Sequence, residues 1–198
     1  ERFELHARPE ITVEANPGTL TPALLRALRS AGVTRVSLGA QSFAPGELKM
    51  LGRTHTAEET REACHAVLEA GLDLSLDLIS DIPGQTASSW VSTLEKAVET
   101  AARHISAYPL SLEEGTPMEA AFDAGLFPGY PDSSDGMMLL TAEFLEGAGL
   151  HRYEVANYAA PGFESRHNLS YWTGRQYIGV GPSAHSMFDA DTARAIGL

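Results

Sequence analysis

Short apolar runs alternate with helical patterns along the first 115 residues of the chain. Strands are predicted over residues 11–15, 35–41, 74–80 and 104–112. Helices are predicted over residues 21–32, 54–71 and 86–101, where hydrophobic side chains recur at helical spacing. This alternation predicts parallel β/α/β units, which either a barrel or a doubly wound sheet would contain.

The two faces of the predicted strands favour the barrel. In the third strand Leu74, Leu76 and Leu78 share one face, whereas Ser75 and Asp77 lie on the other. Strands covered by helices on both faces read instead as nearly continuous apolar runs. We therefore predict an α/β fold with a β/α barrel, whose polar face lines the inside and whose site lies at the C-terminal strand ends.

After residue 115 the pattern changes, and we predict two domains, a barrel over 1–115 and a smaller α+β region over 116–198 that packs on it. The second region is expected to hold two helices within 115–149, an extended segment at 152–159, and a strand with a Gly/Pro turn over 176–188. Between the last two lies RHNLSYW (166–172), which places a histidine beside an asparagine and ends on an aromatic pair.

RHNLSYW has two readings from its residues alone. It is either a ligand site or a short helix that Asn168 caps, with Tyr171 and Trp172 packed inward. The remaining histidines are scattered, and most are expected on the surface or in loops; they are His6, His55, His65, His104, His151 and His185.

Composition narrows the class of partner. The 198 residues carry 14 Lys and Arg against 26 Asp and Glu, a formal net charge of −12, so nucleic acid is not an expected partner. No apolar run approaches the ~20 residues that span a bilayer, and the first residues do not read as a signal peptide, although a peripheral membrane contact stays open. The single cysteine, Cys64, excludes an internal disulfide and agrees with a cytoplasmic location.

Four polar residues form a candidate site at the predicted mouth of the barrel. Glu14, Gln41 and Asp77 lie near the C-terminal ends of three successive strands, and Arg53 follows in a loop. Carboxylates accept from an ammonium group or ribose hydroxyls, and a guanidinium clamps a carboxylate, so an amino acid joined to a nucleoside would suit them. In the alternative reading, Glu14 and Arg53 form a structural ion pair while Gln41 and Asp77 bond loop amides.

Several motifs resemble those of the HemW and HemN group of radical S-adenosylmethionine (SAM) proteins. They are EITVEANPGTL, RVSLGAQSF, LKMLGRTH, LDLISDIPGQT, RYEVANYA, RHNLSYW and YIGVGPSAHS. The resemblance covers nearly the whole chain in order. It implies a six-stranded β/α barrel that holds SAM and a [4Fe-4S] cluster, with the four predicted strands matching its third to sixth.

The resemblance also implies roles for individual residues. Arg53 would hold the methionine carboxylate of SAM, Glu14 its amino group, and Gln41 and Asp77 its ribose hydroxyls. His167, Asn168 and Tyr171 match an HNxxY haem-binding motif, with His167 as the ligand of the haem iron. These matches imply a haem chaperone that passes haem to acceptor haemoproteins.

The chain departs from the family pattern in three places. It has neither the CxxxCxxC cluster motif nor GGGTP, and Cys64 lies in a predicted helix, so we expect no [4Fe-4S] cluster and no radical chemistry in this chain. We expect a fragment of a longer protein or a truncated relative, since the chain starts where the third strand would start. Asp81 stands where the family pattern has glycine. The alternatives are an oxygen-independent coproporphyrinogen III oxidase and a non-functional truncated remnant.

Overall fold

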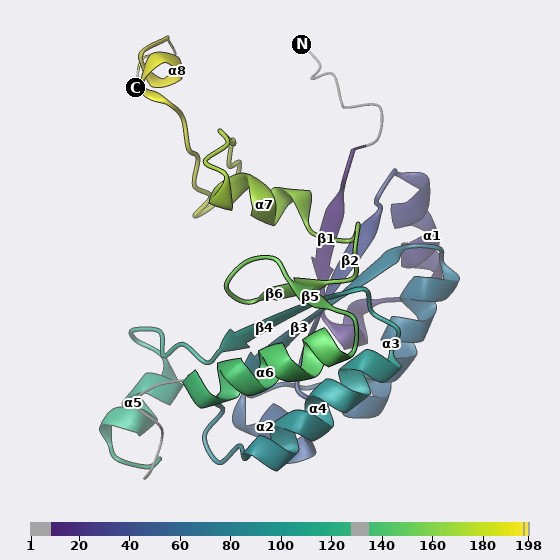
Figure 1. The fold of residues 1–198 in the computed structure, drawn as a ribbon, viewed down its shortest axis with the longest axis vertical. Coiled ribbons are helices and arrows are strands. Elements are labelled where there is room, and N and C mark those ends of the chain that lie inside the picture. Colours follow the sequence, from purple (N-terminus) through teal and green to yellow (C-terminus); the bar gives the residue numbers. More distant parts are fainter. Residues whose placement is uncertain (1–8, 128–134, 196, 198) are drawn as a thin grey trace. The chain divides into compact units, whose positions relative to one another are not determined.

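The computed structural model of the protein describes residues 9–127, 135–195 and 197 (Figure 1). The strands are β1 (Thr12–Ala15), β2 (Arg35–Gln41), β3 (Asp73–Ser80), β4 (His104–Pro109), β5 (His151–Arg152) and β6 (Asn157–Ala159). The helices are a 3-10 turn η1 (Pro17–Thr19), α1 (Pro22–Ser30), α2 (Pro45–Met50), α3 (Ala57–Glu69), α4 (Ala87–Glu99), α5 (Pro117–Asp123), α6 (Asp135–Gly147), α7 (Arg166–Trp172) and α8 (Ala190–Ala195). The strands and helices predicted for the first 115 residues are all present, whereas η1, α2 and α8 were not predicted.

The strands form one sheet in the order β1-β2-β3-β4-β6-β5. The first four strands are parallel, as the alternating pattern predicts, and β6 and β5 continue the sheet in antiparallel pairing. The pairing of β2 with β3 shifts between Leu38 and Gln41, where β2 carries a bulge.

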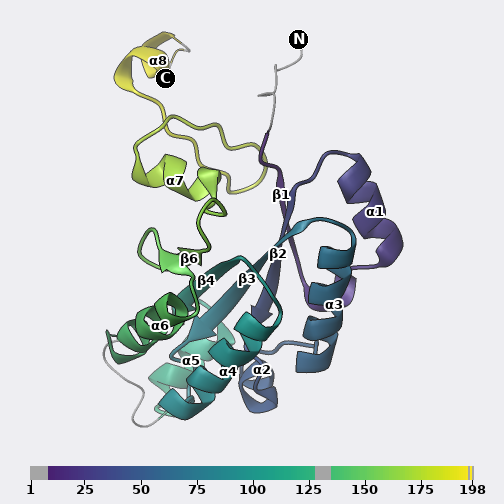
Figure 2. The ribbon, with the colours of Figure 1, turned by 45° about the vertical axis from the view of Figure 1, so that its right-hand side comes forward.

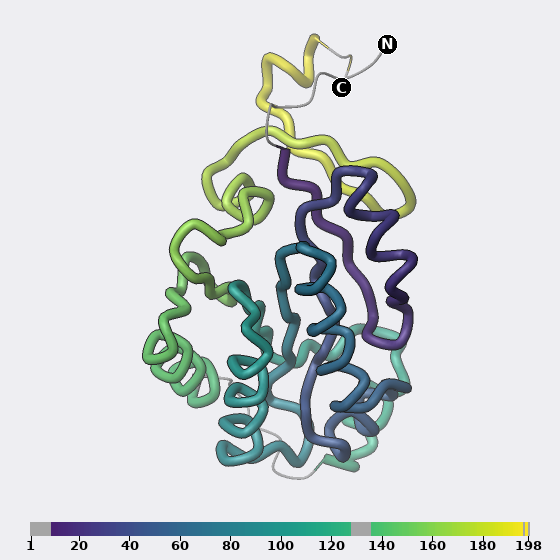
Figure 3. The backbone as a smooth tube through the Cα atoms, turned by 90° about the vertical axis from the view of Figure 1, so that its right-hand side faces the viewer, coloured from purple at the N-terminus to yellow at the C-terminus, as the bar shows by residue number. Residues whose placement is uncertain are grey.

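Helices α1, α3, α4 and α6 lie side by side along one face of the sheet (Figures 2 and 3). That face is the apolar one predicted from the alternation, and its side chains form the buried core with those of the helices. Trp90 of α4 is fully buried, and its indole Nε1 donates to Thr141 Oγ1 of α6 at 2.8 Å. The sheet and its helix layer therefore form the α/β arrangement that the sequence predicts.

The opposite face of the sheet carries small and polar side chains. Ser37 of β2, Ser75 and Asp77 of β3, and His104 and Ser106 of β4 follow one another at alternate positions on this face. In a β/α barrel the face opposite the helices lines the inside, so this is the face on which the sequence predicts the site.

The helix starts have side-chain caps that fix where each helix begins. Thr56 and Glu59 form the capping box that their spacing predicts at α3, and Thr86 with Ser89 forms another at α4. At α7, however, Ser165 is the capping residue, because its hydroxyl accepts from the backbone N–H of Asn168 at 3.3 Å. The prediction that Asn168 caps this helix is wrong.

The chain forms two compact units, Glu1–Phe163 and Glu164–Leu198. The strands β5 and β6 follow the predicted domain boundary at residue 115, yet they belong to the first unit through the sheet. The boundary at 115 stays a prediction. Within the described part of the chain, no helix combines the length and apolar character that crossing a bilayer requires.

Two predictions about the second unit are wrong. A strand followed by a Gly/Pro turn was predicted over 176–188; the turn is present at residues 181–183, but the strand is reduced to one antiparallel bridge between Tyr177 and Met187 among the described residues. Tyr171 and Trp172 were predicted to pack inward as an alternative to ligand binding, and they are instead 43% and 61% exposed. The aromatic pair of RHNLSYW is therefore a surface feature of its unit.

Candidate functional site

Asp77 lies at the centre of the polar face of the sheet, where neighbouring strands hold its carboxylate. The Ser37 hydroxyl on β2 contacts both carboxylate oxygens, at 3.1 and 3.0 Å, and Ser106 is its partner in register on β4. Burial raises the pKa of Asp77, hydrogen bonds from Ser106 and Ser37 lower it, and the charge of Glu14 raises it. The carboxylate is thus fixed in orientation while part of its surface stays accessible.

Gln41 lies on β2, next to the strand of Asp77, and Glu14 lies on β1, one strand farther along the sheet. Glu14 pairs in register with Ser37 and its side chain is exposed. Gln41 follows the bulge of β2 with a φ of 64°, and its amide folds back over Gly39. A Cβ atom on Gly39 would lie 2.8 Å from Gln41 Nε2, so a larger residue at this position would displace the Gln41 amide.

Arg53 is held near the same strand ends by its loop. The buried ring of His55 bonds the carbonyl oxygen of Ala40 through Nε2 at 3.2 Å, and the backbone N–H of Arg53 donates to Leu48 O at 2.9 Å. The Arg53 side chain is exposed. In the described residues Glu14 and Arg53 form no ion pair with each other, so the alternative structural reading of these two charges is not what the structure shows.

Behind these residues, a buried carboxylate joins the loops that follow β2 and β3. Glu47 of α2 accepts from Ser42 at 2.5 Å and from Gln85 at 3.0 Å, and its other oxygen accepts from Ser89 of α4 at 2.7 Å. We call these four residues the Glu47 cluster. The cluster fixes the two loops that frame the candidate site.

The donor set of this site fits SAM but not an iron–sulfur cluster. Two accessible carboxylates, an amide and a guanidinium match the charges of a nucleoside-linked amino acid. Cys64 is a poor ligand, since it is buried on α3 and burial raises the pKa of its thiol to about 12. Within the described ranges, no three His, Cys, Asp or Glu side chains are grouped so as to hold a metal.

The second candidate site lies on α7 in the unit Glu164–Leu198. Tyr171 is four residues after His167, so the two side chains share one face of the helix. Their rings meet edge to face at 4.8 Å, and the Tyr171 hydroxyl lies 2.9 Å from His167 Nε2. Tyr177 packs against the other side of Tyr171 with ring centroids 4.4 Å apart. Asn168 contributes its backbone N–H to the helix start.

Exposed apolar side chains occur in the same unit. Trp172 is 61%, Ile178 64% and Val180 90% exposed. Haem iron commonly takes a histidine nitrogen as its protein ligand, and apolar and aromatic side chains pack against the porphyrin. The residues of this unit therefore fit a haem, with His167 as the candidate ligand.

Sequence reasoning missed the residues that support the first site. Ser37 and Ser106 could have been found, since alternation puts them on the face of Asp77. His55 and Glu47 gave no such indication because their roles depend on contacts between loops. Among the other histidines expected on the surface or in loops, His104 is the exception because it is buried within β4, and His6 lies outside the described residues.

Asp81 replaces the expected glycine at a strained backbone position. Its φ is 57°, in the left-handed region that glycine adopts without cost, and its buried carboxylate accepts from Ser80 Oγ at 2.7 Å. Burial raises the pKa of this carboxyl. The glycine expected at this position would adopt the left-handed conformation without strain.

We expect Asp81→Gly to stabilise the protein by about 1 kcal/mol in urea unfolding at pH 7, because glycine relieves the left-handed strain and removes a buried carboxylate. Ala101→Gly is the matched control, since Ala101 has a φ of 60° at an exposed position. Ala101→Gly is expected to show only the stabilisation that comes from relieving left-handed backbone strain, because it removes no carboxylate. A loss of stability in Asp81→Gly would mean that the Ser80 hydrogen bond outweighs the strain.

Comparison with known proteins places these two sites in a family context. Residues 1–97 match the family model described as the Radical SAM superfamily. The chain is 37% identical over 187 residues to a protein named "Heme chaperone HemW" from Lactococcus lactis, covering 93% of this chain and 49% of that protein. It is 39% identical over 189 residues to a mouse protein named "Radical S-adenosyl methionine domain-containing protein 1, mitochondrial", covering 93% of this chain and 42% of that protein.

Among solved structures, the chain is similar to coproporphyrinogen III oxidase (HemN) from Escherichia coli, described there as a radical SAM enzyme. The TM-score is 0.75 at 22% identity, over 94% of this chain and 46% of that one. This similarity confirms the predicted fold class. The chain spans about half the length of the curated relatives it matches.

Proposed function

Since this chain belongs to the radical SAM superfamily, we propose that it functions as part of a haem chaperone. In this role it binds haem through α7 and SAM at the polar face of its sheet. The observation that carries the proposal is the exposed His167–Tyr171 pair, in the same unit as exposed apolar side chains. Relatives named heme chaperone support it, since they are 35–39% identical over most of the chain. Acceptor haemoproteins would be the partners, and the cytoplasm the proposed location.

In the proposed SAM site each residue has a distinct task. Arg53 binds the carboxylate of the methionine part, and Glu14 accepts from its ammonium group. Gln41 and Asp77 bond the ribose hydroxyls, with Ser37 and Ser106 holding the Asp77 carboxylate in orientation. SAM supplies radical chemistry only with a reduced [4Fe-4S] cluster, whose cysteine ligands are not among the residues of this chain.

A porphyrin oxidase is the second candidate function. The HemN structure is a fold neighbour at 22% identity, and that similarity shows the fold alone. The chaperone name instead occurs among relatives of higher identity. We therefore favour haem carriage over oxidation of coproporphyrinogen, and a remnant without function is the outcome if neither ligand binds.

The haem site is tested by titrating the full chain with haemin and following the Soret band. We expect His167→Ala to weaken binding by at least about tenfold, since the iron loses its protein ligand. His185→Ala is the matched control, because His185 is an exposed histidine of the same unit. Equal affinity in the wild-type protein and His167→Ala would remove His167 as the ligand.

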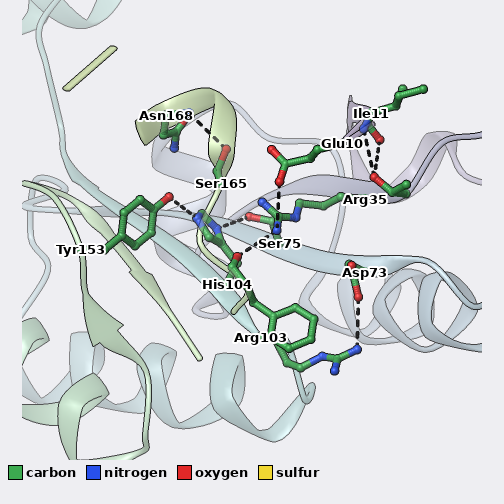
Figure 4. Close-up of polar contacts among 12 residues, drawn as sticks. Glu10, Ile11, Arg35, Asp73, Ser75, Arg103, His104, Tyr153, Ser165 and Asn168 are labelled. Carbon is green, nitrogen blue, oxygen red and sulfur yellow. Dashed lines mark hydrogen bonds and ion pairs between the residues drawn. The ribbon is translucent and has the colours of Figure 1, made fainter. Parts of the chain in front are cut away.

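The SAM site is tested by calorimetric titration with SAM. We expect Asp77→Asn to weaken binding by about tenfold, because hydrogen bonds to a charged group contribute about 1.5–3 kcal/mol. Asp73→Asn serves as control, since Asp73 starts the same strand and pairs with Arg103 at 3.1 Å, away from the strand end (Figure 4). An equal loss in both variants would point to a general effect on the sheet.

A further inference from the structure

The Tyr171 hydroxyl is hydrogen-bonded to Nε2 of His167, the nitrogen through which this imidazole would bind haem iron. In the structure it lies 2.9 Å from Nε2 of His167, the ring nitrogen farther from the backbone. One lone pair on a neutral imidazole nitrogen serves either a hydrogen-bond donor or a metal, but not both at once. Tyr171 is therefore more than a packing neighbour of His167.

We propose that Tyr171 competes with the haem iron for Nε2 of His167, and so acts as a release residue that keeps haem binding reversible. The inference rests on the proposed haem site. It gives the tyrosine of the HNxxY motif a task opposed to that of the histidine. Ligation then requires the hydroxyl of Tyr171 to leave Nε2, and release allows it to return.

The geometry favours a defined competitor over a chance contact. The spacing of four residues keeps both side chains on one face of α7, and the edge-to-face packing of their rings adds a second contact. Tyr177 packs against Tyr171 from its other side, which limits the positions of the ring. Three aromatic rings thus hold the hydroxyl at Nε2 in the haem-free protein.

The exchange needs no further reactant. With the proton of the imidazole on Nδ1, Tyr171 donates its O–H to the Nε2 lone pair. If that lone pair were to bind haem iron, this one hydrogen bond would break and one coordinate bond would form, while Tyr171 would keep its proton. Losing this hydrogen bond makes the free energy of haem binding less favourable. Weaker binding suits a protein that transfers its haem to another protein.

The test compares haemin affinity and the rate of haem transfer to apomyoglobin in the full chain. Tyr171→Phe removes the hydroxyl and keeps the ring, so we expect haem to bind about threefold to tenfold more tightly and to leave more slowly, the range that one net hydrogen bond covers. Tyr177→Phe is the matched control, because its ring contacts Tyr171 but no hydrogen bond to His167 involves it in the described residues. A structural readout is the ¹⁵N shift of His167 Nε2 without haem, which should change only in Tyr171→Phe.

Each outcome has one meaning. Unchanged or weaker affinity in Tyr171→Phe, with His167→Ala still defective, would overturn the competition while leaving the haem site intact. Complete loss of binding in Tyr171→Phe would make the tyrosine itself a ligand, which also overturns the inference. Wild-type affinity in both Tyr171→Phe and His167→Ala would instead remove the proposed site.

Discussion

Acidification from pH 6.5 to pH 3 is expected to destabilise the protein by about 4 to 5 kcal/mol through His104 alone, at about 1.4 kcal/mol for each pH unit. The His104 ring is 3% exposed, and burial followed by the charge of Arg35 lowers its pKa from 6.5 to about 3. Below pH 6.5 the unfolded chain binds a proton at His104, whereas the folded chain does not until about pH 3. The unfolded state is therefore favoured as the pH falls through this window.

The hydrogen bonds of His104 explain why it stays neutral. Its Nδ1 lies 2.7 Å from Ser75 Oγ, and its Nε2 lies 2.7 Å from the hydroxyl of Tyr153 (Figure 4). Hydroxyls serve as donor or acceptor, so a neutral imidazole is satisfied at both nitrogens. A protonated ring would add a charge beside Arg35, which already contacts Glu10 at 3.8 Å.

The measurement is urea unfolding at several pH values for the wild-type protein and His104→Gln. Glutamine cannot titrate, so its variant should show a flatter loss of stability below pH 6.5, whatever its stability at pH 7.5. Asp77 and Asp81 act in the opposite direction, because a carboxyl whose pKa is raised by burial binds its proton earlier in the folded state. They are unchanged in His104→Gln, and an identical slope in both proteins would contradict the prediction.

Trp90→Ala is expected to lower the free energy of unfolding by about 3 to 5 kcal/mol, the range for removing a large aromatic side chain from a core. Trp90 has no exposed surface and lies where α4 packs on α6. Its removal leaves a cavity between the two helices and also removes the indole N–H that donates to Thr141 Oγ1 at 2.8 Å, although the Thr141 hydroxyl keeps its bond to Met137 O. Chemical unfolding followed by circular dichroism measures the loss.

Two conservative variants separate the cavity from the hydrogen bond. Trp90→Phe keeps most of the ring volume and loses the N–H, so it should cost less than half as much. Thr141→Val leaves the indole N–H buried without its acceptor, for a loss of about 1 to 3 kcal/mol. A loss below about 1 kcal/mol in Trp90→Ala would show that the helices close over the gap.

The elements of the sheet could be predicted because their causes are local. Alternation within each strand identified the apolar and polar faces, and capping residues located helix starts such as Thr56. The same alternation placed Glu14 and Asp77 on one face, and the register of the strands agrees. It also places His104 on that face, beside Ser106, so its burial could have been expected.

Features that depend on contacts between distant segments could not be predicted. The bulge that turns Gln41 arises from the pairing of β2 with β3, and Glu47 gains its partners only when two loops meet. On α7, the choice of Ser165 as the cap depends on which hydroxyl reaches the Asn168 N–H. The contact between Tyr171 and His167 could be predicted only if residues 166–172 were known to be helical, because side chains four residues apart share a face in a helix.

The Glu47 cluster has a consequence for how the strand-end loops move. Because a single carboxylate accepts from Ser42, Gln85 and Ser89, fluctuations of the loop after β2 and of the loop after β3 are correlated rather than independent. A ligand that orders one loop also orders most of the other, so the second loop loses little further conformational entropy. Amide hydrogens of both loops are then expected to exchange with solvent in the same opening event, as one cooperative unit.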